Sequence, residues 1–273
     1  MFKIIRESFR LTNKYIVLAT PLILFSLLSS LYLAFSVRGN SISTVFAVIL
    51  FFLMCGAFLS GWFLMISRCV KNPEFEDPNT LLKEFPEGVG EYFLPTIGML
   101  IMSFIVGVVM FFISYFIGMK FIGDTGIPSA DFSAAMASVD SLKTFLTSLP
   151  NDQLIKLNLW NMLLFFTMSL TYFVIMFYSP ALFFKNKNAF VALFKEFKDL
   201  FSRHFFKNVL LFLFIFIVYS LISVLITIFG GNIFAHFIFT LVNFYFFTYA
   251  VVLVYNYYYN NFVKIGSNID ERV

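Results

Sequence analysis

Residues 188–207 read NAFVALFKEFKDLFSRHFFK and run directly into the apolar segment 208–229. Apolar side chains in this stretch recur at steps of three and four residues, while cationic and other polar side chains fill the opposite face. This pattern predicts an amphipathic helix, and its mixture of Phe with Lys and Arg is typical of a helix that lies in the plane of a membrane interface. The stretch therefore indicates a surface helix placed directly before a membrane span.

The composition of the whole chain supports a membrane protein. Of its 273 residues, 60% are hydrophobic and 12% are charged, and the mean hydropathy is +0.88. A soluble domain typically carries about 25% charged residues. Long uninterrupted apolar runs favour helices, which satisfy their own backbone hydrogen bonds in lipid. We therefore predict an all-α fold, a polytopic bundle of transmembrane helices with amphipathic helices at the interface, in which residues 1–273 form a single integral membrane domain.

Six segments are long enough to cross a hydrocarbon core of ~30 Å, which takes about 20 helical residues. These predicted spans are residues 15–36, 44–67, 92–119, 158–183, 208–229 and 232–258. The first is longer than the apolar part of a signal peptide and lacks an A-x-A cleavage site, so we expect it to stay uncleaved. Pro21 is a candidate bend in the first span, and we expect Pro95 and Pro180 to mark span ends.

The distribution of cations predicts the orientation of the spans. Most Lys and Arg residues lie in the N-terminal segment, the second and fourth connections and the C-terminal tail. The positive-inside rule therefore places both termini in the cytoplasm, which agrees with an even number of spans. Because the cations flank spans instead of forming one patch, the sequence argues against nucleic-acid binding. The cations expected at the membrane interface are Arg6, Arg10, Lys195, Lys198, Arg203 and Lys207.

The sequence predicts three repeats of one unit, an amphipathic helix (the leading helix) followed by two spans. Residues 4–7, 81–85 and 193–197 align as an apolar pair followed by a cation and Glu, each ahead of a span and its hairpin partner. In the middle unit we expect Pro86, Gly88 and Gly90 to break the leading helix. The acidic residues of this connection, from Glu74 to Glu91, fit either a solvated loop or a site for a cation or basic partner.

The long connection 120–157 is the exception to otherwise short links. Within it, residues 129–149 carry apolar side chains at helical spacing and predict one weak amphipathic helix. Such a helix fits two roles, a structural cap on the bundle or a lid that gates a substrate.

The spans contain almost no ionisable side chains, which argues against a proton-coupled pump or a hydrolase with a carboxylate pair. Uncharged polar residues remain, and we predict that Asn161, Asn243 and Asn256 make hydrogen bonds between helices, each worth about 0.6–2 kcal/mol. We predict no disulfide between Cys55 and Cys69, and the chain has no recognisable catalytic, cofactor-binding or metal-binding motif. The sequence thus predicts no enzyme.

Two segments carry a resemblance to a known group. Residues 178–182 (YSPAL) close span four, and Asn188, Ala189 and Phe190 open the amphipathic helix before span five. These segments resemble those of bacterial six-span membrane proteins, including the YciC-like family and the membrane domain fused to some glycerophosphodiester phosphodiesterases. The resemblance implies a six-span protein of the bacterial inner membrane. The catalytic domain of the phosphodiesterases has no counterpart here, so no hydrolase activity is implied.

Two functions remain open at this point. The first is a non-enzymatic scaffold, accessory or membrane-organising protein, whose partners are membrane lipids and other membrane proteins. The second is a transporter or permease component for an apolar or lipid-like solute, which the repeat and the long connection favour.

Overall fold

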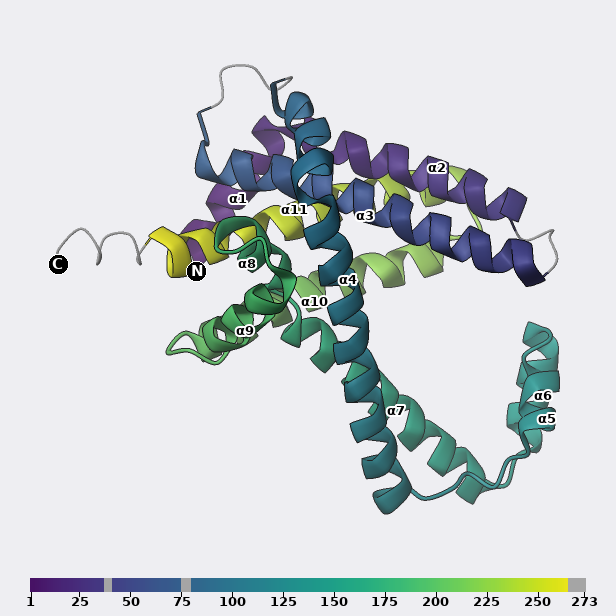
Figure 1. Cartoon of the computed structure of the whole chain (residues 1–273). Helices are drawn as coiled ribbons and strands as arrows, with labels where there is room; N and C mark the ends of the chain where they lie inside the picture. Colours follow the sequence, from purple (N-terminus) through teal and green to yellow (C-terminus); the bar gives the residue numbers. More distant parts are fainter. Residues whose placement is uncertain (37–40, 75–79, 265–273) are drawn as a thin grey trace. The chain divides into compact units, whose positions relative to one another are not determined.

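The computed structural model describes residues 1–36, 41–74 and 80–264, and the regular structure in these ranges is entirely helical (Figure 1). The all-α prediction is confirmed. The elements in chain order are α1 (Phe2–Lys14), the 3-10 turn η1 (Ile16–Ala19), α2 (Thr20–Ser36), α3 (Ser41–Lys71), α4 (Thr80–Phe121), α5 (Ser129–Ala135), α6 (Val139–Ser148), α7 (Asn151–Val174), α8 (Tyr178–Phe184), α9 (Ala189–Leu200), α10 (Phe205–Phe229), α11 (Ile233–Tyr258) and the short π-helix η2 (Tyr259–Val263).

Six helical segments of the described residues are long and apolar enough to cross a membrane. They are Ile16–Ala34, Thr44–Lys71, Thr80–Phe121, Asn151–Phe184, Phe205–Phe229 and Ile233–Val263. Large apolar side chains along them stay exposed, which is unfavourable in water but matches the hydrocarbon of a bilayer. The chain is therefore a multi-pass integral membrane protein, and the predicted number of spans is confirmed.

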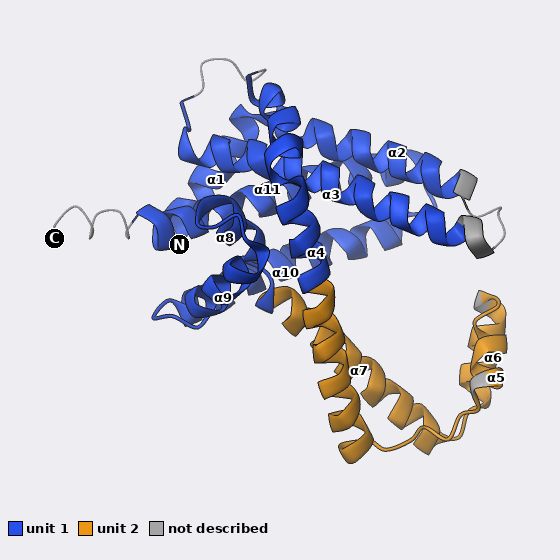
Figure 2. Ribbon diagram, viewed as in Figure 1, with its two compact units in different colours: residues 1–102, 174–273 blue, residues 103–173 orange. Residues whose placement is uncertain are grey.

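The chain forms two compact units (Figure 2), unit 1 with Met1–Met102 and Val174–Val273 and unit 2 with Ser103–Phe173. The second half of α11 is the core of unit 1, because α1, α3, α8 and α10 all pack against α11 (Figure 1). Trp62 of α3 is fully buried in unit 1, and its indole N–H donates to the carbonyl of Leu18 at 2.7 Å. The prediction of a single membrane domain stays a prediction.

Helix α4 corrects the expected break in the middle repeat. It continues from Thr80 through Pro86, Gly88 and Gly90, and Pro95 also lies inside it and not at a span end. Contacts with α3 hold both sides of Pro86, since Arg68 pairs with Glu84 and with Glu87. The helix thus continues through the proline despite its local cost, with contacts to α3 on both sides of it. The leading helix is separate only in the first and third predicted units, as α1 and α9.

The periodicity of residues 188–207 predicts one helix, but the structure divides this stretch between two helices. Helix α9 ends at Leu200, and a turn leads into α10 at Phe205. The side chain of Asn208 caps the end of α9, because its Nδ2 donates to the carbonyls of Leu200 at 2.8 Å and of Asp199 at 3.3 Å. Carbonyls at the end of a helix lack partners within it, so such bonds stabilise the end.

Two other predicted helices are also divided. The stretch 129–149 forms α5 and α6, and Ser138 accepts a hydrogen bond from the backbone N–H of Ser141 at the start of α6. Such N-caps are strongly favoured at helix starts, so a second helix begins there. The fourth span is interrupted between Val174 and Tyr178, where α8 begins, and Pro180 lies in the first turn of α8.

Candidate functional site: the charged end of unit 1

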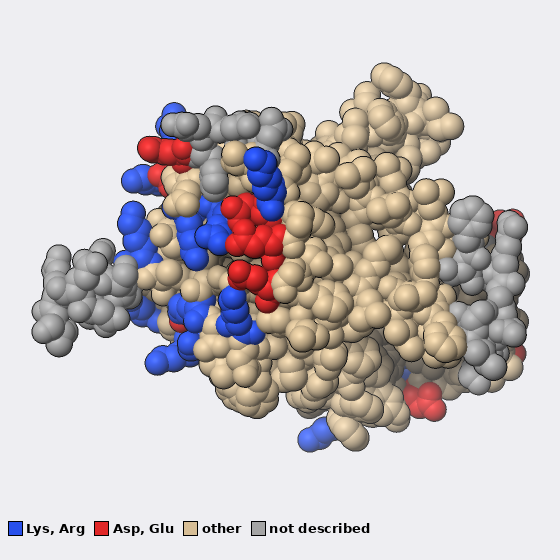
Figure 3. Space-filling view, turned by 45° about the horizontal axis from the view of Figure 1, so that its top comes forward, with Lys and Arg blue, Asp and Glu red and all other residues tan. Residues whose placement is uncertain are grey.

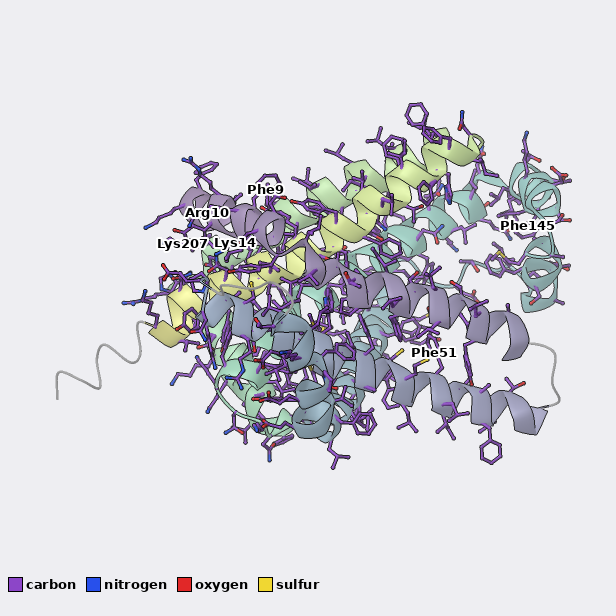
Figure 4. The ribbon with its side chains drawn as sticks, turned by 90° about the horizontal axis from the view of Figure 1, so that it is seen from above. Phe9, Arg10, Lys14, Phe51, Phe145 and Lys207 are labelled. Carbon is purple, nitrogen blue, oxygen red and sulfur yellow. The ribbon has the colours of Figure 1, made fainter. Side chains whose placement is uncertain are left out.

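Charged side chains gather at one end of unit 1, beside a broad uncharged surface (Figure 3). Arg10 and Lys14 of α1 and Lys207 of α10 lie at this end (Figure 4). Phe51, in the N-terminal half of α3, lies away from it (Figure 4). This segregation is expected of a membrane protein, since charges are costly in hydrocarbon and collect where the helices leave it. We call this region the charged end.

An ion pair with an aromatic partner joins three elements at the charged end. Lys185, which follows α8, places its Nζ 2.7 Å from Oδ2 of Asp199 on α9. The hydroxyl of Tyr258 on α11 donates to the same carboxylate oxygen. The Lys185 ammonium also lies 5.1 Å from the centroid of the Tyr258 ring, a distance suited to a cation–π contact. The three side chains together fasten α9 to α8 and α11.

Asn208 extends this network into α10. It is fully buried, and its Oδ1 accepts a hydrogen bond from the hydroxyl of Tyr257 at 2.9 Å while its Nδ2 caps the end of α9. Each polar atom of this amide side chain thus has a partner in the protein. A buried amide with complete hydrogen bonding fixes the mutual positions of the helices that it joins.

Glu196, the Glu of the aligned segment 193–197, is a buried carboxyl group, a position that the repeat pattern does not predict. Its side chain is fully inaccessible, and Oε1 accepts from the backbone N–H of Phe177 at 2.9 Å, just before α8. Burial raises the pKa of Glu196 well above its ordinary value, against the opposing effect of the backbone N–H groups of Phe177 and Tyr178. The signal was present in α9, since Glu196 shares a face with Ala192 and Leu200 at four-residue steps.

A further set of hydrogen bonds joins α1 to α11. Nδ2 of Asn256 donates to Oγ of Ser8 at 3.0 Å, and Asn260 donates to Oδ1 of Asn256 at 2.8 Å. Asn256 therefore bonds to another helix, in the manner predicted for the intramembrane asparagines. Of the other two, Asn243 on α11 has a buried Oδ1 without a hydrogen-bond partner in the described chain, and Asn161 is exposed on α7.

Three of the acidic residues after α3 form ion pairs and do not lie in a solvated loop. Arg68 Nε lies 3.3 Å from Glu84, Arg68 Nη2 lies 3.1 Å from Glu87, and Lys187 Nζ lies 2.8 Å from Glu91. The three carboxylates belong to α4, so the interpretation as a loop is wrong for them. Among the other members of the cluster, Glu74 is exposed, while Glu76 and Asp77 lie outside the described residues.

The face of α9 that does not contact the protein is rich in Phe. Phe190, Phe194 and Phe201 at its end are 56%, 59% and 60% exposed. Cations lie close to them in the sequence, with Lys195 half-buried and Lys198, Arg203 and Lys207 exposed. Arg6 and Arg10 on α1 are exposed too. These positions are compatible with the predicted interfacial role, which stays a prediction.

The histidines do not offer a metal site. The part of the chain that the structure describes contains no group of three or more His, Cys, Asp and Glu side chains placed to hold a metal ion. Burial, then the charges of Arg203 and Lys207, lower the pKa of His204, which favours its neutral form. Cys55 and Cys69 are both free, as predicted.

Comparison with known proteins adds no relative. No protein-family model matches the chain, and no curated protein or solved structure is significantly similar to it. The resemblance to the six-span bacterial group stays an expectation from the quoted segments.

Proposed function

We propose that this protein is a non-enzymatic membrane-organising protein, a scaffold or accessory subunit of a bacterial inner membrane, with the charged end and both termini in the cytoplasm. One observation carries the proposal: the exposed Phe row of α9, formed by Phe190, Phe194 and Phe201, lies beside cations at the charged end. An apolar face of Phe beside cations suits a helix that lies in the interface with its apolar face turned to the lipid, and each nearby cation adds about 1 kcal/mol at an anionic leaflet.

The anchoring of α9 supports a scaffolding role in particular. Asp199, Glu196 and the cap from Asn208 attach the inner face of α9 to α8, α10 and α11. A helix fixed in this way presents its Phe row in one orientation, so lipid contact does not require ordering of a free segment. Lipids and neighbouring membrane proteins are the partners that such a surface suits.

A dye on α9 tests the proposal directly. Phe194→Cys would be labelled with an environment-sensitive dye in a protein whose Cys55 and Cys69 are replaced by Ala. In vesicles containing anionic lipid we expect blue-shifted emission and protection from an aqueous quencher. Adding Lys195→Glu, Lys198→Glu and Arg203→Glu should reduce both effects, whereas Lys143→Glu on α6 should not. A label fully open to the quencher in the otherwise unchanged protein would refute the interfacial assignment.

A permease for a lipid-like solute is the second candidate, and lateral grooves favour it. A groove of about 750 Å³ lies between α3 and α4, with Leu53 and Ala57 on one side and Phe93 and Leu94 on the other. Another of about 630 Å³ lies between the start of the first span and α11. Both are lined mainly by apolar side chains.

Reconstitution separates the two candidates. A permease should move a fluorescent short-chain phospholipid across proteoliposome membranes at a saturable, protein-dependent rate, and Ala57→Phe should slow it by filling the groove. The scaffold proposal expects the rate of protein-free vesicles. A saturable rate that Ala57→Phe reduces would therefore replace the first candidate with the second.

A further inference from the structure

The loop after α4 in unit 2 is held in one conformation by side chains of α7. Nε1 of Trp160 donates to the carbonyl of Gly123, and Nζ of Lys156 donates to the carbonyl of Asp124, each at 3.0 Å. Gly123 and Gly126 have φ values of 78° and 68°, which residues with a side chain rarely adopt. The loop is therefore built in advance of any ligand.

A pocket of about 380 Å³ lies between this loop and the two long helices of unit 2. The rings of Phe111, Tyr115 and Trp160 line it, together with Leu164 and, from the loop, Asp124. Pockets of this size commonly hold small molecules, and most are apolar with a few polar groups that orient the ligand. Because Phe111 and Leu164 lie within membrane-spanning helices, the apolar part of the pocket suits an acyl chain.

Two opposite charges lie at the same loop without neutralising each other. One carboxylate oxygen of Asp124 accepts the backbone N–H of Gly126 at 3.1 Å, and among the described residues no cation lies within ion-pair distance of this carboxylate. The ammonium of half-buried Lys156 bonds to a carbonyl and likewise has no carboxylate partner in the described chain. A single ligand that carries both charges would complement the two side chains.

We propose that this pocket binds a zwitterionic phospholipid with an ammonium headgroup. The ammonium lies against the Asp124 carboxylate and the faces of Tyr115 and Trp160, since aromatic rings attract cations. The phosphate lies at Lys156, and one acyl chain follows Phe111 and Leu164 toward the bilayer interior. The site is in unit 2 and does not depend on the function proposed for the charged end.

Competition between lipids tests the site. The purified full chain would be equilibrated in detergent with equal amounts of phosphatidylethanolamine and phosphatidylglycerol, and bound lipids counted by native mass spectrometry. We expect preferential retention of phosphatidylethanolamine. Asp124→Asn keeps an oxygen for the Gly126 N–H but removes the charge, so it should lower this preference by up to about fivefold, the value of one exposed ion pair. Lys156→Gln should also lower retention.

Matched substitutions elsewhere in unit 2 provide the controls. Asp131→Asn on α5 and Lys143→Gln on α6 remove the same charges away from the pocket and should leave the preference unchanged. Equal retention of the two lipids by the unsubstituted protein overturns the proposal, and so does an equal effect of Asp131→Asn and Asp124→Asn. The comparison on the unsubstituted protein decides the matter even if a variant fails to fold.

Discussion

The charged end of unit 1 and the paired helices of unit 2 are held together in different ways. At the charged end, buried polar side chains such as Asn208 and Asn256 bond to α1, α9 and α11. In unit 2, α4 and α7 meet where Gly118 leaves space for the Trp160 ring, and Thr167 donates to Ser114 at 2.6 Å. A polar network holds the helices of the charged end together. Close packing holds α4 and α7 together, with one hydrogen bond between their described side chains.

We attribute the difference to the solvent that each region is expected to meet. Lipid tails are as apolar as Leu, so helices inside the bilayer gain little from apolar contact alone and associate through small residues and isolated hydrogen bonds. Where the chain leaves the bilayer, helix ends expose backbone groups that need partners. Asn208 and Glu196 supply such partners at the ends of α9 and α8. Substitutions at the charged end should therefore cost more stability than similar ones in unit 2.

The largest effect is expected for Asn208→Leu. The change leaves the Tyr257 hydroxyl and the carbonyl of Leu200 buried without their partner, and each such group costs about 1–3 kcal/mol. We expect the melting temperature in detergent to fall by roughly 6–12 °C, which is about 3 kcal/mol at 2–4 °C per kcal/mol. Asn161→Leu on the exposed face of α7 is the control and should change it little. Equal shifts in the two variants would contradict the contrast between the units.

Two glycines of α4 offer the next comparison. A Cβ on Gly88 would lie 2.7 Å from the carbonyl oxygen of Ser60 and 2.8 Å from Cα of Gly61, both on the backbone of α3. Gly88→Ala should therefore separate the helices and destabilise the protein by about 1–3 kcal/mol, measured as a lower melting temperature. Gly90 has no neighbour within 4 Å of the same position, so Gly90→Ala should be neutral or slightly stabilising. A destabilised Gly90→Ala variant would show that this packing is misassigned.

The buried carboxyl of Glu196 predicts a dependence on pH. Because its pKa is raised in the folded protein, stability falls as the pH rises above the unfolded-state pKa of about 4.3, until the folded-state pKa is passed. Glu196→Gln keeps an oxygen for the Phe177 N–H and removes this loss. We expect similar melting temperatures at pH 4 and a variant that melts about 2–4 °C higher at pH 8.

Exposed Glu74 provides the control for this experiment, since Glu74→Gln should follow the unsubstituted protein at both pH values. A Glu196→Gln variant that keeps the full decline of stability between pH 4 and pH 8 would assign the dependence to another group.

The sequence predicts the spans well because each is a long apolar run, and hydropathy over about 20 residues is a property of the run itself. It predicts the helix breaks poorly because their causes lie elsewhere in the chain. The apolar period of α9 continues past Leu200 to Phe205, whereas the helix ends at Leu200, where the side chain of Asn208 caps it. In α4, the helix continues past the local signal of Pro86, and the partner of Glu84 and Glu87 is Arg68 of α3.

The same limit applies to the candidate site. Charge patterning predicts cations such as Lys198 and Arg203 at the surface, and the sequence also predicts that Asn256 bonds between helices. The partners that make Glu196 and Asn208 structural centres come from α8 and α11 and become evident only in the fold. For Glu196 the sequence carries two signals, its place in the aligned segment 193–197 and its position on one stripe of the helix with Ala192 and Leu200, and neither identifies its partner.

The smallest effect is expected for Thr167→Val in unit 2. The change keeps the shape of the side chain and removes the hydrogen bond to Ser114, and intramembrane bonds of this kind average about 0.6 kcal/mol. The Ser114 hydroxyl can turn to a carbonyl of its own helix, as serines in helices often do, so its cost stays small. We expect the melting temperature to fall by about 1–2 °C. A drop as large as that of Asn208→Leu would mean that unit 2 also depends on a polar contact, and the distinction between the two regions would fail.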